Sequence, residues 1–336
     1  MKHFLQKLMT KTDLGQSEMA SAFDMIMSGQ STPAQTGSFL TALRMKGETI
    51  VEICGAASSM RRHAVFIDTA GASVVDTCGT GGDSLNTFNI STTAAFVAAG
   101  AGVRIAKHGN RAVTSKCGSA DVLSALGVNI EAPPDVVEDC IRTIGIGFLF
   151  AQALHPAMKH AGSVRRDLGI RTIFNMLGPL TNPAGARGQI LGVFSAELTE
   201  TFAWVLKELG SKRALVVHGN DGMDEITTTT TTRISELRDG RIMTREFDPL
   251  PFIGKYATLS DLCGGDPQVN AAITRDVLIG RPGPHRDIVC LNAAGAIVAS
   301  GLADDFGKAV GMAGESIDHG KATRVLEEMV QRTNAA

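Results

Sequence analysis

The sequence DTCGTGGD at residues 76–83 decides the fold, because it places adjacent glycines directly after a strand-like run at residues 72–75. A polar NIST sequence at residues 89–92 then opens an apolar segment at residues 93–99, which is typical of a helix and which ends at Gly100. A strand, a glycine-rich loop and a helix in this order predict the first half of a βαβ unit.

The same order recurs in the residues that follow. A strand at residues 103–106 leads into a polar loop, KHGNR, at residues 107–111, and Ser119 is expected to cap a helix at residues 120–126 that stops at Gly127. Because loops at the carboxyl ends of parallel strands meet at one edge of a sheet, we expect the polar loops of this region to form one ligand site.

The chemistry of these loops favours a phosphorylated ligand. Adjacent glycines let the backbone approach a ligand closely and direct several N–H groups toward it, and a helix N-terminus adds partial positive charge. Lys107 and Arg111 add full positive charge. The loop is no Walker A sequence, since no Gly-Lys-Ser/Thr follows Gly82, and the third glycine of a dinucleotide fingerprint would fall at Ser84.

Length and composition limit the class of protein. A chain of 336 residues suits two domains, and 44% hydrophobic with 20% charged residues is typical of a soluble globular protein. A net charge of −2 argues against a nucleic-acid or membrane-surface protein. We expect a cytoplasmic location, because the N-terminus lacks the apolar core of a signal peptide and no apolar run is long enough to span a bilayer. Reduced thiols are favoured over a zinc site or disulfides, because no Cys-x-x-Cys pair occurs among Cys54, Cys78, Cys117, Cys140, Cys263 and Cys290.

Residues 1–70 are predicted to form a small, all-helical N-terminal domain. Ser17 is expected to cap an amphipathic helix, and the sequences TPAQ at residues 32–35 and TIVE at residues 49–52 are capping boxes that begin two more helices. These helices carry few chemically reactive groups, so packing or dimerisation is the favoured interpretation.

Residues 71–336 are predicted to form a larger α/β domain, with a central, mostly parallel sheet flanked by helices. Strands at residues 146–151, 189–193 and 213–217 and a helix at residues 198–209 continue the alternation of strand and helix.

Four later segments complete the prediction. The segment at residues 155–183 leaves the strand pattern and is rich in basic residues. Asp239-Gly240 lies between two alternating runs and predicts a β-hairpin turn. The threonine run at residues 227–232 is interpreted as a solvated strand. From Pro267 onward the chain is predicted to be mostly helical.

Several motifs resemble those of the anthranilate phosphoribosyltransferase family, and the similarity covers nearly the whole chain. The motifs are GTGGD at residues 79–83, NIST at 89–92, KHGNR at 107–111, VRR at 164–166, GIRTIFN at 169–175, LGPLTNP at 177–183 and the acidic pair at 224–225. The resemblance implies the nucleoside phosphorylase/phosphoribosyltransferase fold, with a helical domain that pairs with its twin in a homodimer and a segment at 155–183 that crosses back to that domain. It also implies transfer of the phosphoribosyl group of 5-phosphoribosyl 1-pyrophosphate (PRPP) to the amine of anthranilate in tryptophan biosynthesis.

The resemblance assigns site residues to three groups. PRPP would be bound by Gly79, Gly82, Asp83, Thr87, Asn89, Ile90, Ser91, Thr92, Lys107, His108, Gly109, Asn110, Arg111 and Ser119. Anthranilate would be bound by Gly79, His108, Asn110, Arg165 and Gly178. Magnesium, with two ions per active site, would be held by Ser91, Asp224 and Glu225. No residue is assigned as a nucleophile, because the reaction requires stabilisation of the leaving pyrophosphate instead.

Structural interpretations stand beside these roles. Ser91 could simply cap a helix, and the acidic pair at residues 224–225 could be a solvated turn. Arg165 presents the planar fork that matches a carboxylate, whereas Arg166 beside it would point elsewhere on a helix. His108 is of the residue type that serves as a general base, but a neutral aromatic amine needs little base assistance, so a shaping role is preferred.

The chain departs from the family pattern near the entry route of the acceptor. Gln152 and Leu154 stand where many members have a proline and a second histidine, and Gly162-Ser163 replaces the common Gly-Pro or Ala-Pro. A paralogue with another aromatic acceptor and a pyrimidine nucleoside phosphorylase therefore stay open as alternatives, although the Lys-His-Ser start of the phosphorylase loop is missing. A nucleic-acid-binding paralogue is the alternative of another class, and the net charge does not favour it.

Overall fold

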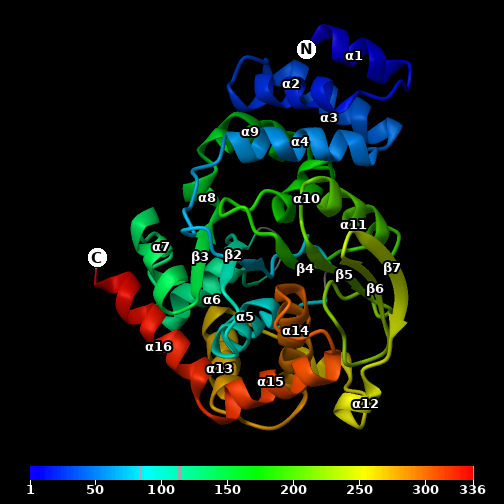
Figure 1. The fold of residues 1–336 in the computed structure, drawn as a ribbon. Coiled ribbons are helices and arrows are strands. Elements are labelled where there is room, and N and C mark those ends of the chain that lie inside the picture. The colour runs from blue at the N-terminus through cyan, green and yellow to red at the C-terminus, as the bar shows by residue number, and fades with distance from the viewer. Residues whose placement is uncertain (84, 113–115, 336) are drawn as a thin grey trace.

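The computed structural model describes residues 1–83, 85–112 and 116–335, and it places a helical bundle on top of an α/β unit (Figure 1). The bundle contains α1 (Lys2–Met9), α2 (Gln16–Met27), α3 (Pro33–Lys46) and α4 (Ile50–Arg62), so the all-helical N-terminal region is confirmed. Within it α2 packs against α4 and α1 packs against α3.

The capping signals in this bundle are confirmed at two helices and wrong at a third. The Thr32 and Thr49 side chains accept hydrogen bonds from the backbone N–H groups three residues later, as capping boxes require. Helix α2 begins at Gln16, one residue before the predicted cap Ser17. Gly15 is the N-cap residue instead, and the carboxylate of Glu18, three residues later, accepts a hydrogen bond from its N–H.

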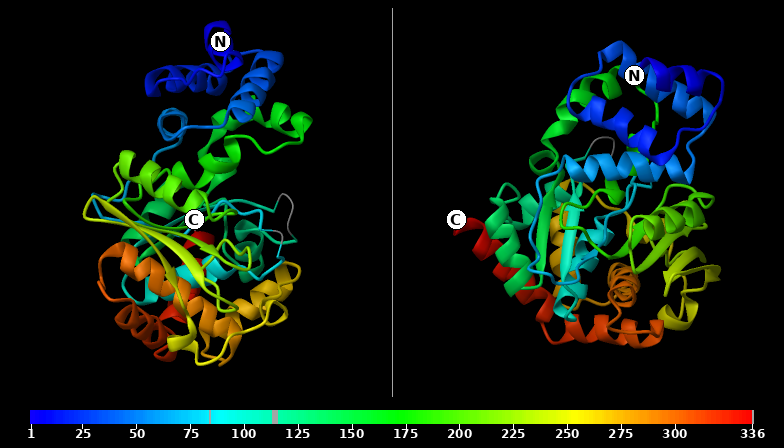
Figure 2. Two further views of the ribbon diagram at one scale, coloured as in Figure 1. Left: turned by 90° about the vertical axis from the view of Figure 1, so that its right-hand side faces the viewer. Right: turned by 45° about the horizontal axis from the view of Figure 1, so that its top comes forward.

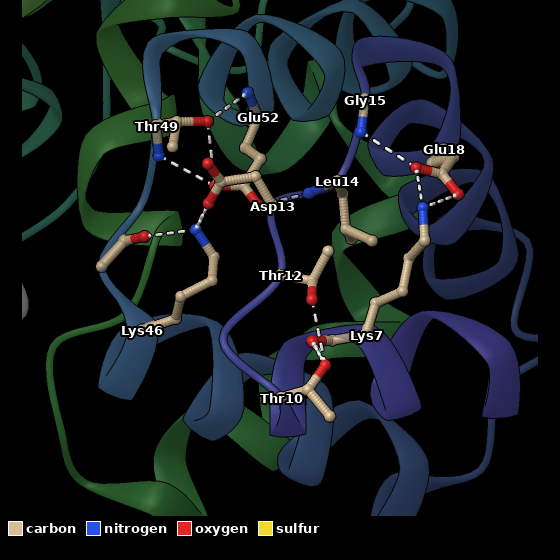
Figure 3. A network of polar contacts seen from close by, with 11 residues as sticks. Lys7, Thr10, Thr12, Asp13, Leu14, Gly15, Glu18, Lys46, Thr49 and Glu52 are labelled. Atoms are coloured by element: carbon tan, nitrogen blue, oxygen red, sulfur yellow. Dashed lines mark hydrogen bonds and ion pairs between the residues drawn. The ribbon is translucent and has the colours of Figure 1, made fainter.

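A buried carboxylate holds the loop between α1 and α2 against the start of α4 (Figure 3). Glu52 is fully buried, and its oxygens accept hydrogen bonds from the N–H of Leu14 at 2.9 Å and the N–H of Thr49 at 2.8 Å. The ammonium group of Lys46 lies 2.9 Å from the same carboxylate and 2.6 Å from that of Asp13. A buried charge is tolerated only when it is paired and hydrogen-bonded, and Glu52 satisfies both conditions.

A seven-stranded sheet forms the centre of the described α/β unit. The strands are β1 (Val75–Asp76), β2 (Ile105–Gly109), β3 (Ile146–Phe150), β4 (Gly188–Gly192), β5 (Arg213–Gly219), β6 (Thr232–Arg238) and β7 (Arg241–Phe247). Their order is β3-β2-β1-β4-β5-β6-β7, in which β1 to β5 are parallel and β6 and β7 add an antiparallel hairpin. The mostly parallel sheet is therefore confirmed, as is the turn at Asp239-Gly240, where both residues have positive φ.

Helices cover both faces of this sheet (Figures 1 and 2). Outside the segment between β3 and β4, the helices of the α/β unit are α5 (Ile90–Gly100), α6 (Ser119–Leu126), α7 (Pro134–Thr143), α11 (Leu198–Glu208), α12 (Leu250–Ile253), α13 (Pro267–Leu278), α14 (Pro284–Ser300), α15 (Phe306–Asp318) and α16 (Lys321–Asn334). In β5, Leu215 and Val217 pack into the cluster formed with α5 and α14, whereas Ala214 and Val216 pack toward α11. Side chains alternate along a strand, so one apolar run supplies both faces.

The segment between β3 and β4 returns to the helical bundle. It contains α8 (Ala151–Leu154), a 3₁₀ turn (Pro156–Met158), α9 (Lys159–Leu168), α10 (Phe174–Leu177) and a second 3₁₀ turn (Gly178–Leu180). Helix α9 packs against α2 and α3, and α10 packs against α4. One hydrophobic cluster consequently runs from Leu8 in α1 through Phe174 and Phe202 to Val216 in the sheet.

Three further local predictions, all in the α/β unit, are wrong, each because a tertiary contact decided the local structure. Strand β2 extends to Gly109, so Lys107 and His108 lie on a strand and not in a loop. Ser119 lies in the first turn of α6, which Gly118 caps, because the hydroxyl of Ser119 bonds the backbone of Asn110 instead.

The threonine run is the third correction. Strand β6 begins only at Thr232, and residues 227–231 form a loop that is buried or half-buried, not a solvated strand. The hydroxyl groups of Thr227 and Thr229 donate to the carboxylate of Asp221, which draws the run inward. Among the described residues, no helix is both long and apolar enough to cross a lipid bilayer.

Candidate active site

The strand order reverses between β1 and β4, and this is where the candidate site lies. The chain proceeds outward from β1 to β2 and β3 on one side, and from β4 to β5 on the other. A crevice forms at the carboxyl ends of the strands at such a point, and α/β proteins bind ligands there. The pocket in this position is lined by Thr77, Gly79, Ser91, Ala94, Ile190, Gly192, Asp224, Glu225 and Asn292.

Backbone contacts bring three loops together in this pocket. A Cβ atom at Gly192, the last residue of β4, would collide with the carbonyl oxygen of Asp224. A Cβ atom at Gly79 would lie 3.0 Å from the carbonyl oxygen of Gly192 and 3.2 Å from Oδ2 of Asp224. Glycine at both positions therefore permits the loop after β5 to cross the end of β4 and meet the glycine loop after β1.

Three carboxyl groups meet at this crossing. Burial raises the pKa of Asp224 to about 7, assisted by the negative charge of Asp83 and a hydrogen bond to its carboxyl group. Burial likewise raises the pKa of Glu225 to about 8, with the charge of Asp224 as the next cause and that of Lys107 opposing it. Carboxylates forced together in a half-buried pocket match a divalent cation, because magnesium prefers oxygen ligands and relieves their repulsion.

Ser91 and Lys107 complete the polar wall of the pocket. The N–H of Ser91, in the first turn of α5, donates to Oε1 of Glu225 at 3.1 Å. Asn89 precedes this helix at the N-cap, so Ser91 does not cap it. The Nζ atom of Lys107 is buried and lies 3.1 Å from Oγ1 of Thr77, 3.2 Å from the carbonyl oxygen of Thr77 and 3.5 Å from Oγ of Ser91. The three predicted metal ligands, Ser91, Asp224 and Glu225, therefore lie together with Asp83 and one cation.

A pair of neutral imidazoles lies behind Lys107. Nδ1 of His108 donates to the carbonyl oxygen of Gly178 at 3.2 Å, because a carbonyl can only accept. Nε2 of His108 then carries no proton, and it accepts from Nε2 of His155 at 3.2 Å. Burial lowers the pKa of His108 to about 3, with the proximity of His155 as the next cause, and burial lowers the pKa of His155 to about 4.

A second group of three potential cation ligands is already engaged in contacts within the protein. Ligand atoms of Asp76, Cys78 and His108 lie within 4.8 Å of one another. The carboxylate of buried Asp76, however, already accepts from the N–H of His108 and from Nδ2 of Asn182. We interpret this trio as a structural support that fixes the end of β1 against β2.

Other residues predicted to bind PRPP have protein partners for their side chains. Asn89 bonds Cys117 and Asn270. Arg111 forms an ion pair with Asp121 at 3.2 Å, and this pair lies at the start of α6. The remaining residues are held by packing or backbone contacts. Ile90 and Thr92 are buried, and Thr87 forms an isolated antiparallel β-bridge with Cys263. Gly109 is packed so closely that a Cβ atom there would collide with Oγ of Ser119. Gly82 is exposed in the glycine loop.

The predicted acceptor residue with the most distinctive environment is Arg165. Arg165 lies on α9, with its guanidinium carbon 5.0 Å from the ring centre of Phe174. Among the described residues it has no carboxylate partner, and burial lowers its pKa. A half-buried guanidinium without a counter-ion is well suited to bind an anionic ligand. Arg166 is exposed, in agreement with the expectation that it points elsewhere.

The two residues that depart from the family pattern have different environments. Leu154 is buried, its carbonyl oxygen accepts from the N–H of Val65, and its side chain packs in the core. Gln152 is exposed, and its Nε2 donates to Oδ1 of Asn110 at 3.2 Å. The N–H of Arg111 donates to the same oxygen at 2.8 Å, and the Nδ2 group of Asn110 has no hydrogen-bond partner among the described residues.

Comparison with known proteins agrees with this architecture. Residues 2–64 match the helical bundle domain of the Glycosyl transferase family, and residues 71–323 match its a/b domain. Anthranilate phosphoribosyltransferase of Syntrophobacter fumaroxidans is 56% identical over 330 residues, which cover 98% of each chain. The chain belongs to the anthranilate phosphoribosyltransferase family.

Solved structures of this family superpose over nearly the whole chain. The anthranilate phosphoribosyltransferase of Thermus thermophilus has a TM-score of 0.93 at 41% identity, covering 98% of this chain and 99% of that one. The Saccharomyces cerevisiae enzyme in complex with PRPP and Mg has a TM-score of 0.90 at 30% identity, covering 99% and 98% respectively. The predicted fold of the family is thus confirmed.

The motifs identified in the sequence do not include Asn292, which organises the acidic loop. Asn292 lies in α14 and is buried. Its Oδ1 accepts from the N–H of Ile226 and its Nδ2 donates to the carbonyl oxygens of Ile226 and Ile288, all at 2.9 Å. Both backbone groups of the residue after Glu225 are therefore held by one amide. A lone asparagine in the otherwise apolar run at residues 288–299 was the available sequence signal.

Replacing this amide should loosen the carboxylate pair. We expect Asn292→Leu to lower the unfolding free energy by about 3 kcal/mol, since two backbone groups lose their buried partners. The same variant should require a higher magnesium concentration for half-maximal PRPP binding, measured by calorimetry. Asn129→Leu, which removes the hydrogen bonds of an exposed asparagine to Thr333 and Glu131, is the control and should leave the magnesium requirement unchanged.

Proposed function

We propose that this chain transfers the phosphoribosyl group of PRPP to the amine of anthranilate, releasing N-(5-phosphoribosyl)anthranilate and pyrophosphate, as a step of tryptophan biosynthesis. The observation that carries the proposal is the meeting of Asp83, Asp224 and Glu225 beside the glycine loop and Lys107 at the switch point of the sheet. Carboxylates that approach a phosphate-binding loop require a metal between them and the phosphates.

At the donor end, the glycine loop and the start of α5 supply backbone N–H groups to the phosphate oxygens. Ser91, Asp224 and Glu225 would hold two magnesium ions, and Asp83 is close enough to Asp224 to share in this role. When bound, magnesium would neutralise the negative charge that grows on the leaving pyrophosphate. Lys107, buried beside Thr77 and Ser91, contributes a fixed positive charge to the same end.

At the acceptor end, Arg165 binds the carboxylate of anthranilate and Asn110 donates from its Nδ2 group to the same substrate. Gln152 orients Asn110 by donating a hydrogen bond to Oδ1 of its amide, which directs Nδ2 away from Gln152. His108 keeps Gly178 in place through the hydrogen bond to its carbonyl oxygen, and so shapes the acceptor path. No protein nucleophile is needed, because the neutral amine attacks the sugar carbon directly as pyrophosphate departs.

We further propose two domains, at residues 1–70 and 71–336, with the segment at 155–183 between them and closure of the cleft during turnover. We also propose a cytoplasmic homodimer formed through the helical bundle. Met9 and Met45 support this arrangement, because these large apolar side chains on α1 and α3 are 77% and 79% exposed in the single chain.

The direct test follows the loss of anthranilate fluorescence in a mixture of purified protein, PRPP and magnesium. Turnover that stops when PRPP or magnesium is withheld supports the proposal. Phosphorolysis of thymidine would instead favour the nucleoside phosphorylase alternative, and salt-sensitive retention on single-stranded DNA would favour the nucleic-acid-binding alternative. Binding of PRPP without turnover would keep the donor site and require a different aromatic acceptor.

A test at His108 separates shaping from base catalysis. We expect His108→Asn to raise the KM for anthranilate about tenfold and to leave the pH profile unchanged in shape between pH 6 and 9, because an imidazole of such low pKa is neutral throughout. Steady-state kinetics with each substrate varied in turn is the measurement, with exposed His319→Asn as the control. A loss of several orders of magnitude with unchanged substrate affinity would refute the shaping role.

A further inference from the structure

Arg171 connects the segment between α9 and α10 to the glycine loop. Its Nη2 donates to the carbonyl oxygen of Gly82 at 2.9 Å. Its guanidinium carbon lies 4.3 Å from the ring centre of Phe194, a cation–π distance. Among the described residues, Arg171 forms no ion pair with a carboxylate, so its polar contact is directed to this loop.

Phe194 holds the other side of the same loop. Its N–H donates to Oγ1 of Thr80 at 3.2 Å, while the N–H of Thr80 donates to the carbonyl oxygen of Gly192 at 2.8 Å. Residues at the end of β4 therefore hold the glycine loop at two points. The backbone groups of Gly192 and Phe194 bond Thr80, and the ring of Phe194 supports Arg171, which bonds Gly82.

The loop needs such support because of its glycines. Gly81 and Gly82 adopt φ values of +65° and +86°, and both are exposed. Adjacent glycines have the largest conformational freedom of any dipeptide, so this conformation is one of many unless outside contacts select it. The residue that follows Gly82 is Asp83, whose carboxyl group contacts Asp224. Fixing Gly82 therefore also fixes the third carboxylate.

We propose that Arg171 is a positioning residue for PRPP: seated on Phe194, it holds the glycine loop in the conformation that meets the diphosphate. This inference rests on the proposed function. It also joins the two substrate sites, because Arg171 belongs to the segment that carries Arg165 and Gly178 yet acts on the donor loop. The conformation of the acceptor segment is thereby coupled to that of the donor loop through the side chain of Arg171.

The first experiment needs no ligand. Hydrogen–deuterium exchange of the amides at residues 79–83 should be faster in Arg171→Gln and in Phe194→Leu than in the wild type, with the melting temperature unchanged. Arg166→Gln, an exposed arginine of the preceding helix, is the matched control and should leave this exchange unaltered. Unchanged exchange in both variants would overturn the proposal, whatever reaction the protein catalyses.

The second experiment measures binding of PRPP with magnesium by calorimetry, without anthranilate. Arg171→Gln should weaken binding about tenfold, the size of one lost charge-assisted hydrogen bond, and Phe194→Leu should weaken it as well. The double variant should be no weaker than Arg171→Gln alone, because both changes break one contact chain. Additive effects, or a Phe194→Leu protein that binds normally, would mean that Arg171 touches the diphosphate itself and would overturn the positioning role.

These outcomes are separable from failure of the proposed function. A wild-type protein that binds PRPP but does not consume anthranilate would remove only the acceptor assignment, and the two experiments would still decide the inference. A wild-type protein that does not bind PRPP would overturn the proposed function and the ligand part of the inference together.

Discussion

The double variant Asp224→Asn/Glu225→Gln should lose at least about 10³-fold in kcat/KM for PRPP, because metal-assisted stabilisation of a leaving diphosphate supplies several kcal/mol. Two neutral amides retain the shape of the acidic pair but neither repel one another nor attract a divalent cation. The measurement is the initial rate with PRPP varied at several magnesium concentrations and fixed anthranilate. Asp239→Asn, in the exposed hairpin turn between β6 and β7, is the matched acid-to-amide control and should leave the rate unchanged.

The same pair should make the metal-free protein sensitive to pH. The pKa values of Asp224 and Glu225 are raised to about 7 and about 8, so the folded state holds more protons than the unfolded state from about pH 4 to pH 8. The unfolding free energy therefore falls as the pH rises through this window, and magnesium should restore it at the upper end. A double variant with the same pH dependence and magnesium response as the wild type would contradict the metal-site assignment.

Arg165→Ala should raise the KM for anthranilate by about 100-fold while leaving PRPP binding within about twofold, since a bidentate contact to a carboxylate provides roughly two charge-assisted hydrogen bonds. Arg165 is the natural anchor because its guanidinium rests on Phe174 and faces no protein carboxylate among the described residues. Fluorescence-detected kinetics with anthranilate varied at saturating PRPP is the measurement.

Two further variants sharpen this result. Arg165→Lys keeps the charge but loses the planar fork, so it should recover only part of the affinity for anthranilate. Arg166→Ala removes the exposed neighbour and should behave as the wild type. A larger effect of Arg165→Ala on PRPP than on anthranilate would move this residue from the acceptor site to the donor site.

Local signals predicted most of the fold. The glycine loop at residues 76–83, the apolar helix after it and the capping boxes at Thr32 and Thr49 all depend on neighbours in sequence, and the structure confirms them. The end of β2 was missed because pairing with β3 continues through Lys107 and His108, whose polar side chains suggested a loop. The threonine run was misjudged because its partner, Asp221, lies in a loop whose path no local pattern indicates.

The site residues divide in the same way. The acidic pair and Ser91 could be singled out by motif, whereas the contact between Asp83 and Asp224 joins residues far apart in sequence and follows only from the crossing of β4 by the acidic loop. Asn292 and Arg171 act through backbone groups of other loops, at Ile226 and Gly82, and every residue type carries such groups, so a sequence does not indicate these partners. Long-range contacts of this kind require the coordinates.

The hydrophobic cluster that runs from Leu8 through Phe174 and Phe202 into the sheet has an evolutionary consequence. Recombination between related genes at the junction near residue 70 would inherit the bundle from one parent and α10 and α11 from the other. The buried surfaces of α4 and α11 would then have diverged separately and would no longer fit, so most such hybrids would fold poorly. Lineages should therefore transmit both halves as one unit, and their substitutions on the two sides of this junction should be correlated.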